Sequence, residues 1–552
     1  MGVVVENDHP PCWILDAIRA IQAEPNAQIV QVLTTGDGRG GAPRERLPER
    51  LAHLAYDGFR ALDTRLFRRP QDAFEPGDLE TLLPACPHRQ VAATRRDDGL
   101  WLGESERAAI DGLHLDVVVD FGAPSLRTSS GALARLGAWS YRHGSMPRFA
   151  DAPPGFRELI ADRACLYSAL VSDLGPESAT RLQYSSWSAV DYRSPYRTMN
   201  DCLTKLAQFP ARALRAVDGS SGPAAAAEST QEALIPECRH PSAPPGNLEV
   251  CKGAAILAAR LARDRLRALV EDNTWFLACG FGLDPLRPRP DRLLTPPPGR
   301  FWADPFPIAA DDGYWIFFEE GPLAVQRGRL SVMHMDRSGR CEAPVVVLEE
   351  ATHVSYPCVF RAGKETWMVP ESKATRSVRM FRARRFPFAW EEEAVLLHDV
   401  DACDSTLAEI DGRWWMFANV APAHGSTWDE LHLYYADRPQ GPWTAHPRNP
   451  VVSDVRSARP AGHLFEHAGR WYRPAQDLGP GYGSAVAIQR IERIDPQDYS
   501  EVEVTRILPD WNRRMLGVHT LNRAGDLTVM DGLYRAPRFR KAATALKLSG
   551  RE

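Results

Sequence analysis

Apolar and polar positions repeat in one pattern five times between Arg300 and Tyr534. In each unit a short apolar strand opens on a polar residue, a turn follows, and an aromatic strand ends on another polar residue. The units begin roughly 50 residues apart, which is the length of a four-stranded propeller blade; their first residues are Ala303, Ser355, Cys403, Ala461 and Gly517. The pattern therefore predicts an all-β five-bladed propeller over residues 271–540.

The two ends of this region are expected to close the ring. The last unit runs out near Arg538 and lacks an outer strand. The isolated apolar strand Thr274–Gly280 lies just before the first unit and has no partner of its own there. Because a closed ring leaves no unpaired blade, this strand is predicted to complete the last blade.

Polar residues recur at matching positions at the openings and the ends of these strands. The openings share one ten-residue step to the second strand, seen in the pairs Asp304 and Tyr314, Tyr356 and Thr366, Asp404 and Trp414. The second strands end on Glu319, Glu371, Asn419 and Gln476. Since the first strand of each blade lines the central channel, the sequence predicts one polar pocket there, with further candidate ligands at Trp302, Glu320, His353, Arg459, Asp477 and His519.

A ring of carboxylates with aromatic and cationic neighbours is what sugar chemistry needs. One carboxylate acts on water or on the anomeric carbon, and one acid protonates the leaving oxygen. Other interpretations stay open at each position. Asp304 and Asp404 can cap turns, Arg459 can pair with a channel acid instead of a substrate, and His353 and His519 can be hydrogen-bonded core residues.

The N-terminal third predicts a different fold, an α/β Rossmann-like domain. Short apolar strands at Gly2–Val5, Ile29–Leu33 and Leu115–Phe121 are separated by helical patterns at Trp13–Gln22 and Glu49–Phe67. This alternation indicates a mostly parallel sheet covered by helices. A further helix is expected over Ser130–Leu136.

The segment after that helix resembles the N-terminal domain of folate-dependent formyltransferases. In that family a strand leads into an Asn-x-His-x-Ser-Leu-Leu-Pro segment, and here His143, Ser145 and Pro147 match while Tyr141 replaces the asparagine. The family's later catalytic aspartate has no counterpart around Ala169–Gly175. Because formyl transfer needs an oxyanion donor beside a carboxylate-held base, the resemblance implies a degenerate domain in which only His143 remains, either as an anion ligand or as a structural residue.

The domain boundaries follow from composition. Residues 1–215 form the formyltransferase-like domain, and residues 216–247 form a linker rich in Ala, Ser, Gly and Pro. Residues 248–270 show apolar positions at helical spacing and predict a connecting amphipathic helix. The propeller covers residues 271–540, and residues 541–552 are a basic tail.

Charge and cysteine content exclude several classes of partner. The formal net charge of −5 shows no basic excess for nucleic acid or an anionic membrane. The sequence contains no run of about 18 apolar residues and opens on an acidic segment, which predicts no transmembrane segment and a cytoplasmic location. The ten cysteines form no CxxC or Cys/His cluster, so neither a metal site nor a cofactor is expected.

The propeller region resembles two families that act on sugars. RFWADPF and the blades after it are similar to the five-bladed arabinanases, xylosidases and invertases, and FWADPF, HVSYPCVF, WMVPES and GRWWMF are similar to the N-terminal region of plant glucosamine inositolphosphorylceramide transferases. The resemblance implies Asp304 as base or nucleophile, Asp404 as the carboxylate that tunes the acid, and Glu371 as general acid. The hydrolases take their acid from a later blade, where this chain has Asn419 and Gln476.

Two classes of function remain. The first is a glycosidase or glycosyltransferase that acts on a glycoside, a nucleotide sugar or a glycoconjugate at the propeller mouth. The second is a non-catalytic scaffold that binds a sugar, a glycolipid or a partner protein, and an active formyltransferase is a weaker third. Two carboxylates about 5 to 10 Å apart across an open pocket would favour the enzyme, whereas pairing of the channel acids with Arg459 would favour the scaffold.

Overall fold

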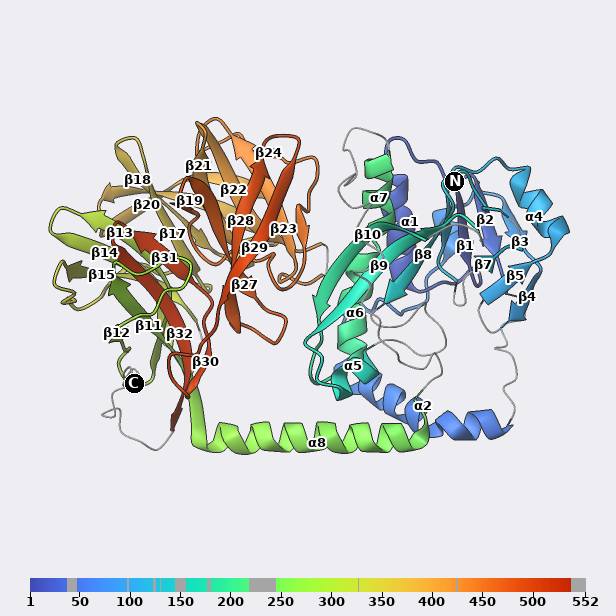
Figure 1. Ribbon diagram of the computed structural model, residues 1–552, viewed down its shortest axis with the longest axis horizontal. Coiled ribbons are helices and arrows are strands. Elements are labelled where there is room, and N and C mark those ends of the chain that lie inside the picture. The colour runs from blue at the N-terminus through green and yellow to red at the C-terminus, as the bar shows by residue number, and fades with distance from the viewer. Residues whose placement is uncertain are drawn as a thin grey trace. The chain divides into compact units, whose positions relative to one another are not determined.

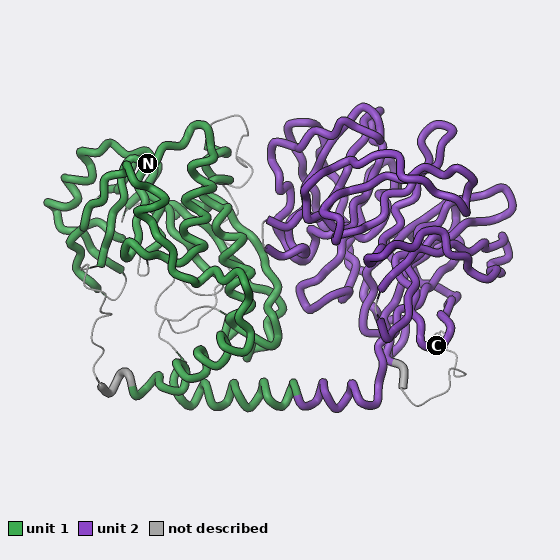
Figure 2. Tube along the Cα trace, turned by 180° about the vertical axis from the view of Figure 1, so that it is seen from behind, with its two compact units in different colours: residues 1–261 green, residues 262–552 purple. Residues whose placement is uncertain are grey.

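The computed structural model describes residues 1–36, 47–96, 99–122, 126–129, 131–143, 155–175, 180–217, 245–325, 327–422 and 425–537. The chain divides into two compact units, residues 1–261 and residues 262–552 (Figure 2). Ser145, Pro147, most of the linker and the basic tail lie outside the described residues. No helix within the described ranges is long and apolar enough to cross a membrane.

Unit 1 is built on a seven-stranded, mostly parallel sheet (Figure 1). Five neighbouring strands of this sheet run parallel, and two further strands are antiparallel additions at one edge. In spatial order the strands are β10 (Arg181–Ala189), β9 (Cys165–Asp173), β8 (Ala138–His143), β6 (Val118–Asp120), β1 (Gly2–Val5), β2 (Gln31–Thr34) and β3 (His88–Gln90). A second sheet contains β4 (Ala93–Arg96), β5 (Gly99–Leu102) and β7 (Leu126–Arg127).

Both faces of the larger sheet are buried. Val3 and Val5 of β1 belong to a core with α1 (Cys12–Gln22), α6 (Pro195–Leu206) and α7 (Phe209–Val217), while Val4 belongs to a second core with the small sheet and α4 (Glu104–Asp111). This explains why the strand is a continuous apolar run. The other helices of this region are α2 (Leu47–Phe67), α3 (Leu79–Leu82) and α5 (Phe156–Ile160), while α8 (Asn247–Val270) begins in unit 1 and ends in unit 2.

The predicted helix over Ser130–Leu136 is wrong. Residues 131–136 form bends and turns. Gly131 and Gly137 adopt φ values of +63° and +87°, a region that a right-handed helix does not use and that glycine enters without steric penalty. The Thr128 hydroxyl donates a hydrogen bond to the Gly131 carbonyl oxygen at 2.7 Å, which holds the turn.

Unit 2 contains five antiparallel sheets that correspond to the five predicted blades (Figure 1). The first is β13 (Arg300–Ala310), β14 (Gly313–Pro322), β15 (Arg329–Asp336), β16 (Val345–Leu348), and the second is β17 (Ser355–Ala362), β18 (Glu365–Glu371), β19 (Ser377–Arg385), β20 (Ala389–His398). The third is β21 (Ala402–Ile410), β22 (Arg413–Val420), β23 (Glu430–Ala436), β24 (Thr444–Ala445) with β25 (Val452–Ser453), and the fourth is β26 (Phe465–His467), β27 (Arg470–Asp477), β28 (Ala485–Ile494), β29 (Tyr499–Ile507).

The fifth sheet is shared between the two ends of this region, as the sequence predicts. β11 (Glu271–Phe281) pairs antiparallel with β32 (Leu527–Pro537) along its whole length. The same sheet contains β12 (Arg292–Leu294), β30 (Met515–Gly517) and β31 (Leu521–Ala524). The expected strand Thr274–Gly280 therefore lies within β11 and completes the last blade.

Apolar side chains from neighbouring blades form shared cores. Phe306 and Phe317 of the first blade belong to one buried cluster with Val359 and Met368 of the second and Met416 of the third. The inner strands such as β13 and β22 are buried almost throughout, whereas outer strands such as β16 and β20 keep exposed residues. The polar ends of the inner strands remain to form a site.

Candidate functional site

Asp304, Tyr356 and Asp404 occupy the same unusual backbone position in three blades. Their φ values are +51°, +46° and +51°, and each lies within a β-bulge near the start of the inner strand of its blade. A non-glycine residue in this region costs about 1 to 3 kcal/mol and persists where the surrounding structure enforces it. β-bulges are common beside functional sites, where they change the direction of a side chain. The three residues that match in sequence position therefore also share one backbone conformation.

Asp404 is an ionised carboxylate held by two partners. Arg459 Nε donates to Asp404 Oδ2 at 2.5 Å, and Gln476 Nε2 donates to the same oxygen at 2.6 Å. Burial is the largest influence and would raise the pKa of Asp404, but the charge and hydrogen bond of Arg459, the hydrogen bond with Glu371 and the charge of His519 together hold that pKa below its usual value. The pairing with Arg459 is compatible with two functions. It is the arrangement expected of a non-catalytic binding scaffold, and it also fits an enzyme in which the charge of Asp404 raises the pKa of a neighbouring acid.

Glu371 lies beside Asp404 and has the opposite protonation tendency. Its Oε2 accepts a hydrogen bond from the Asp404 backbone N–H at 3.3 Å and one from Arg459 at 3.5 Å. Burial and then the charge of Asp404 raise the pKa of Glu371 well above its usual value. Two adjacent carboxyl groups with pKa values pushed apart are the arrangement by which enzymes keep an acid and a carboxylate together.

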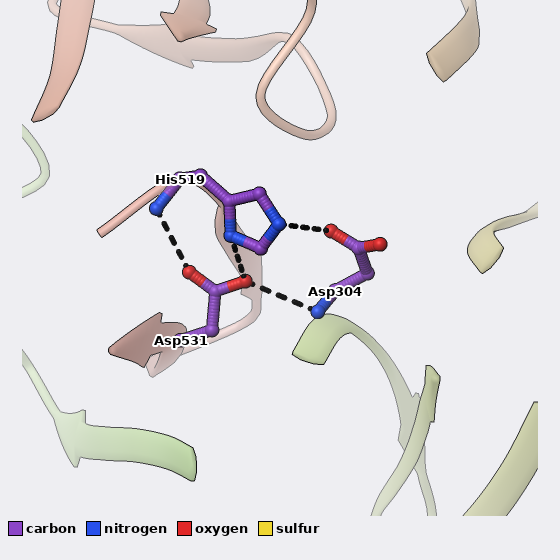
Figure 3. A group of neighbouring side chains, drawn as sticks. All are labelled: Asp304, His519 and Asp531. Carbon is purple, nitrogen blue, oxygen red and sulfur yellow. Dashed lines mark hydrogen bonds and ion pairs between the residues drawn. The ribbon is translucent and has the colours of Figure 1, made fainter. Parts of the chain in front are cut away.

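Asp304 belongs to a second charged group, with His519 and Asp531 (Figure 3). Its Oδ1 accepts a hydrogen bond from the Thr520 hydroxyl at 2.7 Å and lies 3.4 Å from His519 Nε2. His519 Nδ1 lies 2.6 Å from Asp531 Oδ2. Burial raises the pKa of Asp304 to about 6, although the positive charge of His519 opposes the shift.

Protonation of His519 fits this group better than a bound metal does. Burial opposes the imidazolium, but the charges of Asp531 and Asp304 outweigh burial and raise the pKa of His519 to about 9. A metal ligand must be a neutral imidazole. Asp531 also accepts backbone N–H bonds from Asp304, His519 and Thr520. The three side chains can approach one ion, but their contacts describe an imidazolium held between two carboxylates.

The His519 cluster predicts a pH-dependent stability. The pKa of His519 is about 9 in the folded protein and about 6.5 in an unfolded chain. Protonated His519 therefore stabilises the folded protein fully below about pH 6.5, and this contribution to the free energy of unfolding is lost as the pH rises through about 9. The lost free energy of unfolding is about 3 kcal/mol. Urea denaturation of wild type and His519→Gln should therefore show a difference that shrinks from pH ~6 to pH ~9.5. The exposed His398→Gln serves as the control, and a wild-type minus His519→Gln difference that is constant with pH would contradict the assignment.

The other predicted site residues lie in several environments. Trp302 is buried, packs against Phe318 and donates to Glu320 at 3.4 Å, so its ring belongs to the core, and its role in binding a substrate stays a prediction. Asp477 is buried and forms an ion pair with Arg506 at 2.5 Å.

Glu319 and His353 form a pair near the second blade. Their closest atoms are 3.5 Å apart, and His353 Nδ1 also accepts the Gly328 backbone N–H at 2.9 Å. Burial and then the charge of Asp304 raise the pKa of Glu319 well above its usual value. Asn419 is fully buried, and neither of its amide atoms has a hydrogen-bond partner among the residues that the structure describes.

Tyr356 connects three blades through its hydroxyl group. The oxygen accepts the Gly462 backbone N–H at 2.6 Å and lies 2.8 Å from the Thr406 hydroxyl. Its own backbone N–H donates to Asp304 Oδ2 at 3.3 Å. The side chain is fully buried, so Tyr356 fixes the ring around Asp304 and is not exposed to a ligand.

Sequence reasoning missed Asp531, which occupies the matching position in the last blade. In the first blade Glu319 lies two residues beyond Phe317, and in the last blade Asp531 lies two residues beyond Val529. Phe317 and Val529 both pair with the inner strand of their blade. Asp531 is thus the fifth member of the set formed by the second-strand ends. The hairpin of the last blade is shorter than that of the first, so the ten-residue step of the first three units does not lead to it and only the strand pairing reveals the match.

Three aromatic residues near the carboxylates were also missed. Trp275 belongs to β11, and Trp428 and Tyr482 belong to connecting segments. The ring of Tyr482 contacts those of Trp275 and Trp428, with centroids 6.4 and 6.3 Å away. Trp428 and Tyr482 lie outside the strand period, and Trp275 lies in the strand that precedes the first repeat unit, so the repeat marks none of the three positions.

His143 lies in a closed environment in unit 1. It is buried, its Nδ1 lies 2.9 Å from the Ser168 hydroxyl oxygen, and its ring stacks on Tyr141. Burial lowers the pKa of His143 to about 3. A neutral, buried imidazole does not attract an anion, so the structural interpretation of His143 fits these contacts and the anion-ligand interpretation does not.

Comparisons with known proteins concern the propeller. Residues 294–530 match the family described as glucosamine inositolphosphorylceramide transferase 1, N-terminal. Glucosamine inositolphosphorylceramide transferase 1 of Oryza sativa subsp. japonica is 32% identical over 299 residues, which cover 47% of this chain and 40% of the relative. The chain therefore spans less than half the length of that relative.

Two solved structures give weaker similarities. The family 117 glycoside hydrolase Zg3597 of Zobellia galactanivorans is 12% identical, with a TM-score of 0.32 over 48% of this chain and 90% of its own. The arabinanase of Bacillus subtilis is 14% identical, with a TM-score of 0.30 over 42% and 93%. The formyltransferase resemblance of residues 1–210 receives no support from these comparisons. The similarity that stands is that of residues 294–530 to the N-terminal region of a glucosamine inositolphosphorylceramide transferase.

Proposed function

We propose that the propeller acts on a glycoside or an activated sugar, by hydrolysis or by glycosyl transfer, at the ring formed by Asp304, Glu371 and Asp404. The observation that carries the proposal is the unequal sharing of Arg459 by two adjacent carboxyl groups: Arg459 binds Asp404 at 2.5 Å and Glu371 only at 3.5 Å, while Glu371 accepts the Asp404 backbone N–H at 3.3 Å. This arrangement favours the charge on Asp404 and the proton on Glu371, the direction in which burial and their mutual charge move the two pKa values. Cleavage of a glycosidic bond needs one protonated and one ionised carboxyl group. The sequence similarity to a sugar transferase supports the same class of substrate.

Each carboxyl group has its own role in this proposal. Glu371 donates its proton to the leaving oxygen. Asp404, kept ionised by Arg459, holds the pKa of Glu371 high through its charge. Asp304 is the base or nucleophile, because a pKa of about 6 leaves it mostly ionised at neutral pH while still able to take up a proton.

The second candidate is a non-catalytic sugar- or glycolipid-binding module. The ion pair between Asp404 and Arg459, together with the burial of Asp304 and Asp404, favours it. For residues 1–215 the corresponding proposal is a docking or regulatory role. Formyl transfer is disfavoured by the neutral, buried His143, and a failure to bind a folate would remove it.

A substrate screen tests the catalytic proposal. Nucleotide sugars and aryl glycosides are offered to wild type, to Asp304→Asn and to Asp311→Asn, an exposed turn residue of the same blade. We expect turnover by wild type and Asp311→Asn, and a loss of about 10²- to 10⁴-fold in Asp304→Asn. Equal turnover by all three would remove the role of Asp304. Binding without turnover by any of them would move the assignment to the binding module.

A further inference from the structure

An aromatic cluster stands beside the carboxylates of unit 2. Tyr482 contacts Trp275, Trp428 and also His519, whose ring centroid is 5.4 Å from that of Tyr482. The guanidinium carbon of Arg459 lies 5.6 Å from the centre of the Tyr482 ring. Arg459 is the residue that binds Asp404 and Glu371, so one side chain joins the aromatic cluster to the proposed acid pair.

Tyr482 is exposed, although the charged residues around it are buried. It is 46% exposed, whereas Asp304, Asp404 and His519 are each at most 5% exposed. Trp275 and Trp428 are half-buried. The aromatic cluster therefore offers accessible ring surface directly beside Arg459 and the buried carboxylates.

The loop that presents Tyr482 is built for close packing. Gly481 and Gly483 have φ values of +144° and +69°, and a Cβ atom on Gly483 would lie 2.6 Å from Cη2 of Trp275. The Gly483 carbonyl oxygen accepts the Val518 backbone N–H at 2.8 Å, and the Ser484 hydroxyl donates to the Gly481 carbonyl oxygen at 2.7 Å. The two glycines let the backbone lie against Trp275, so the position of Tyr482 is fixed and not a feature of a loose loop.

We propose that Tyr482, with Trp275 and Trp428, forms a stacking subsite for the ring of a pyranoside. This inference rests on the proposed function and specifies its substrate class. A pyranose ring presents a face of C–H groups with partial positive charge, which matches the negative face of an aromatic ring, while its hydroxyl groups can reach Arg459 and Glu371. Arg459 contacts Tyr482 on one side and Asp404 and Glu371 on the other. A ring that stacks on Tyr482 therefore lies next to the acid pair, which favours the sugar ring over the base of a nucleotide at this position.

Saturation-transfer NMR tests the subsite without requiring turnover. The probes are the methyl pyranosides of glucose, galactose, mannose and N-acetylglucosamine, with uridine monophosphate as the nucleobase probe. The proteins are wild type, Tyr482→Ala, Tyr482→Phe and Tyr192→Ala. Tyr192 is a matched control because it is 45% exposed and also lies over an arginine, Arg193, in unit 1.

We expect at least one pyranoside to bind wild type, with the strongest saturation on its ring C–H protons. Tyr482→Ala should weaken that binding about ten-fold, the equivalent of one stacked ring, while Tyr482→Phe and Tyr192→Ala keep it. Unchanged binding by Tyr482→Ala, equal loss in Tyr192→Ala, no pyranoside binding, or a loss confined to uridine monophosphate would each overturn the inference. If Tyr482→Ala loses binding but no substrate turns over, the subsite stands and the catalytic proposal fails.

Discussion

Arg459→Ala is expected to lower the free energy of unfolding by about 3 to 5 kcal/mol. The side chains of Arg459, Asp404 and Glu371 are only 9%, 3% and 10% exposed. Removal of the guanidinium leaves Asp404 as a buried charge without its cation, and burial of an unpaired charge is costly. Urea denaturation followed by circular dichroism measures the change.

Two further variants distinguish the cost of an uncompensated buried charge from the smaller cost of losing an exposed ion pair. Arg289→Ala breaks an exposed pair with Asp510, where the side chains are 67% and 52% exposed, and is expected to change the free energy of unfolding by less than about 1 kcal/mol. Adding Asp404→Asn to Arg459→Ala should recover part of the stability, because the uncompensated charge is gone. An Arg459→Ala protein as stable as Arg289→Ala would contradict this description of the site.

Glu371→Gln is expected to reduce kcat by about 10²- to 10⁴-fold on a substrate with a poor leaving group. A glutamine cannot donate the proton that the leaving oxygen needs. An aryl glycoside whose phenolate leaves without protonation should be affected much less. Steady-state kinetics gives the ratio of the wild-type kcat to the Glu371→Gln kcat on each of the two substrates. Glu365→Gln, an exposed residue of the same strand β18, should leave both rates unchanged. Equal losses by Glu371→Gln on the two substrates would contradict the role as acid.

The propeller was predictable because its repeat is enforced by packing. Each blade buries both faces, so apolar residues return in every unit, and the missing outer strand of the last unit pointed to Thr274–Gly280. The expected helix over Ser130–Leu136 failed for a local reason. The positive φ values of Gly131 and Gly137 are conformations that apolar spacing does not encode.

The part of the site that follows the repeat was predictable, and Arg459 was identified as a possible partner of a channel acid without its partner being known. Asp304, Tyr356 and Asp404 share a register that the sequence displays, and the structure gives them one backbone conformation. The partners of these residues come from other blades: Arg459 is 55 residues from Asp404. The packing of Trp302 on Phe318 is a tertiary contact that the repeat does not encode. Tyr482 lies in a glycine-rich loop that has no period.

The protonation of Glu371 tests the central claim most directly. Infrared difference spectra between wild type and Glu371→Gln, recorded near pH 6, report whether this side chain contributes the C=O stretch of a carboxylic acid or the bands of a carboxylate. An ordinary glutamate, with a pKa of about 4.3, is ionised at that pH. We predict that the carboxylic acid band is present in wild type, absent in Glu371→Gln, and weaker in Asp404→Asn, because the charge of Asp404 raises the pKa of Glu371. Carboxylate bands from Glu371 at that pH would contradict the split in protonation, and with it the proposed chemistry.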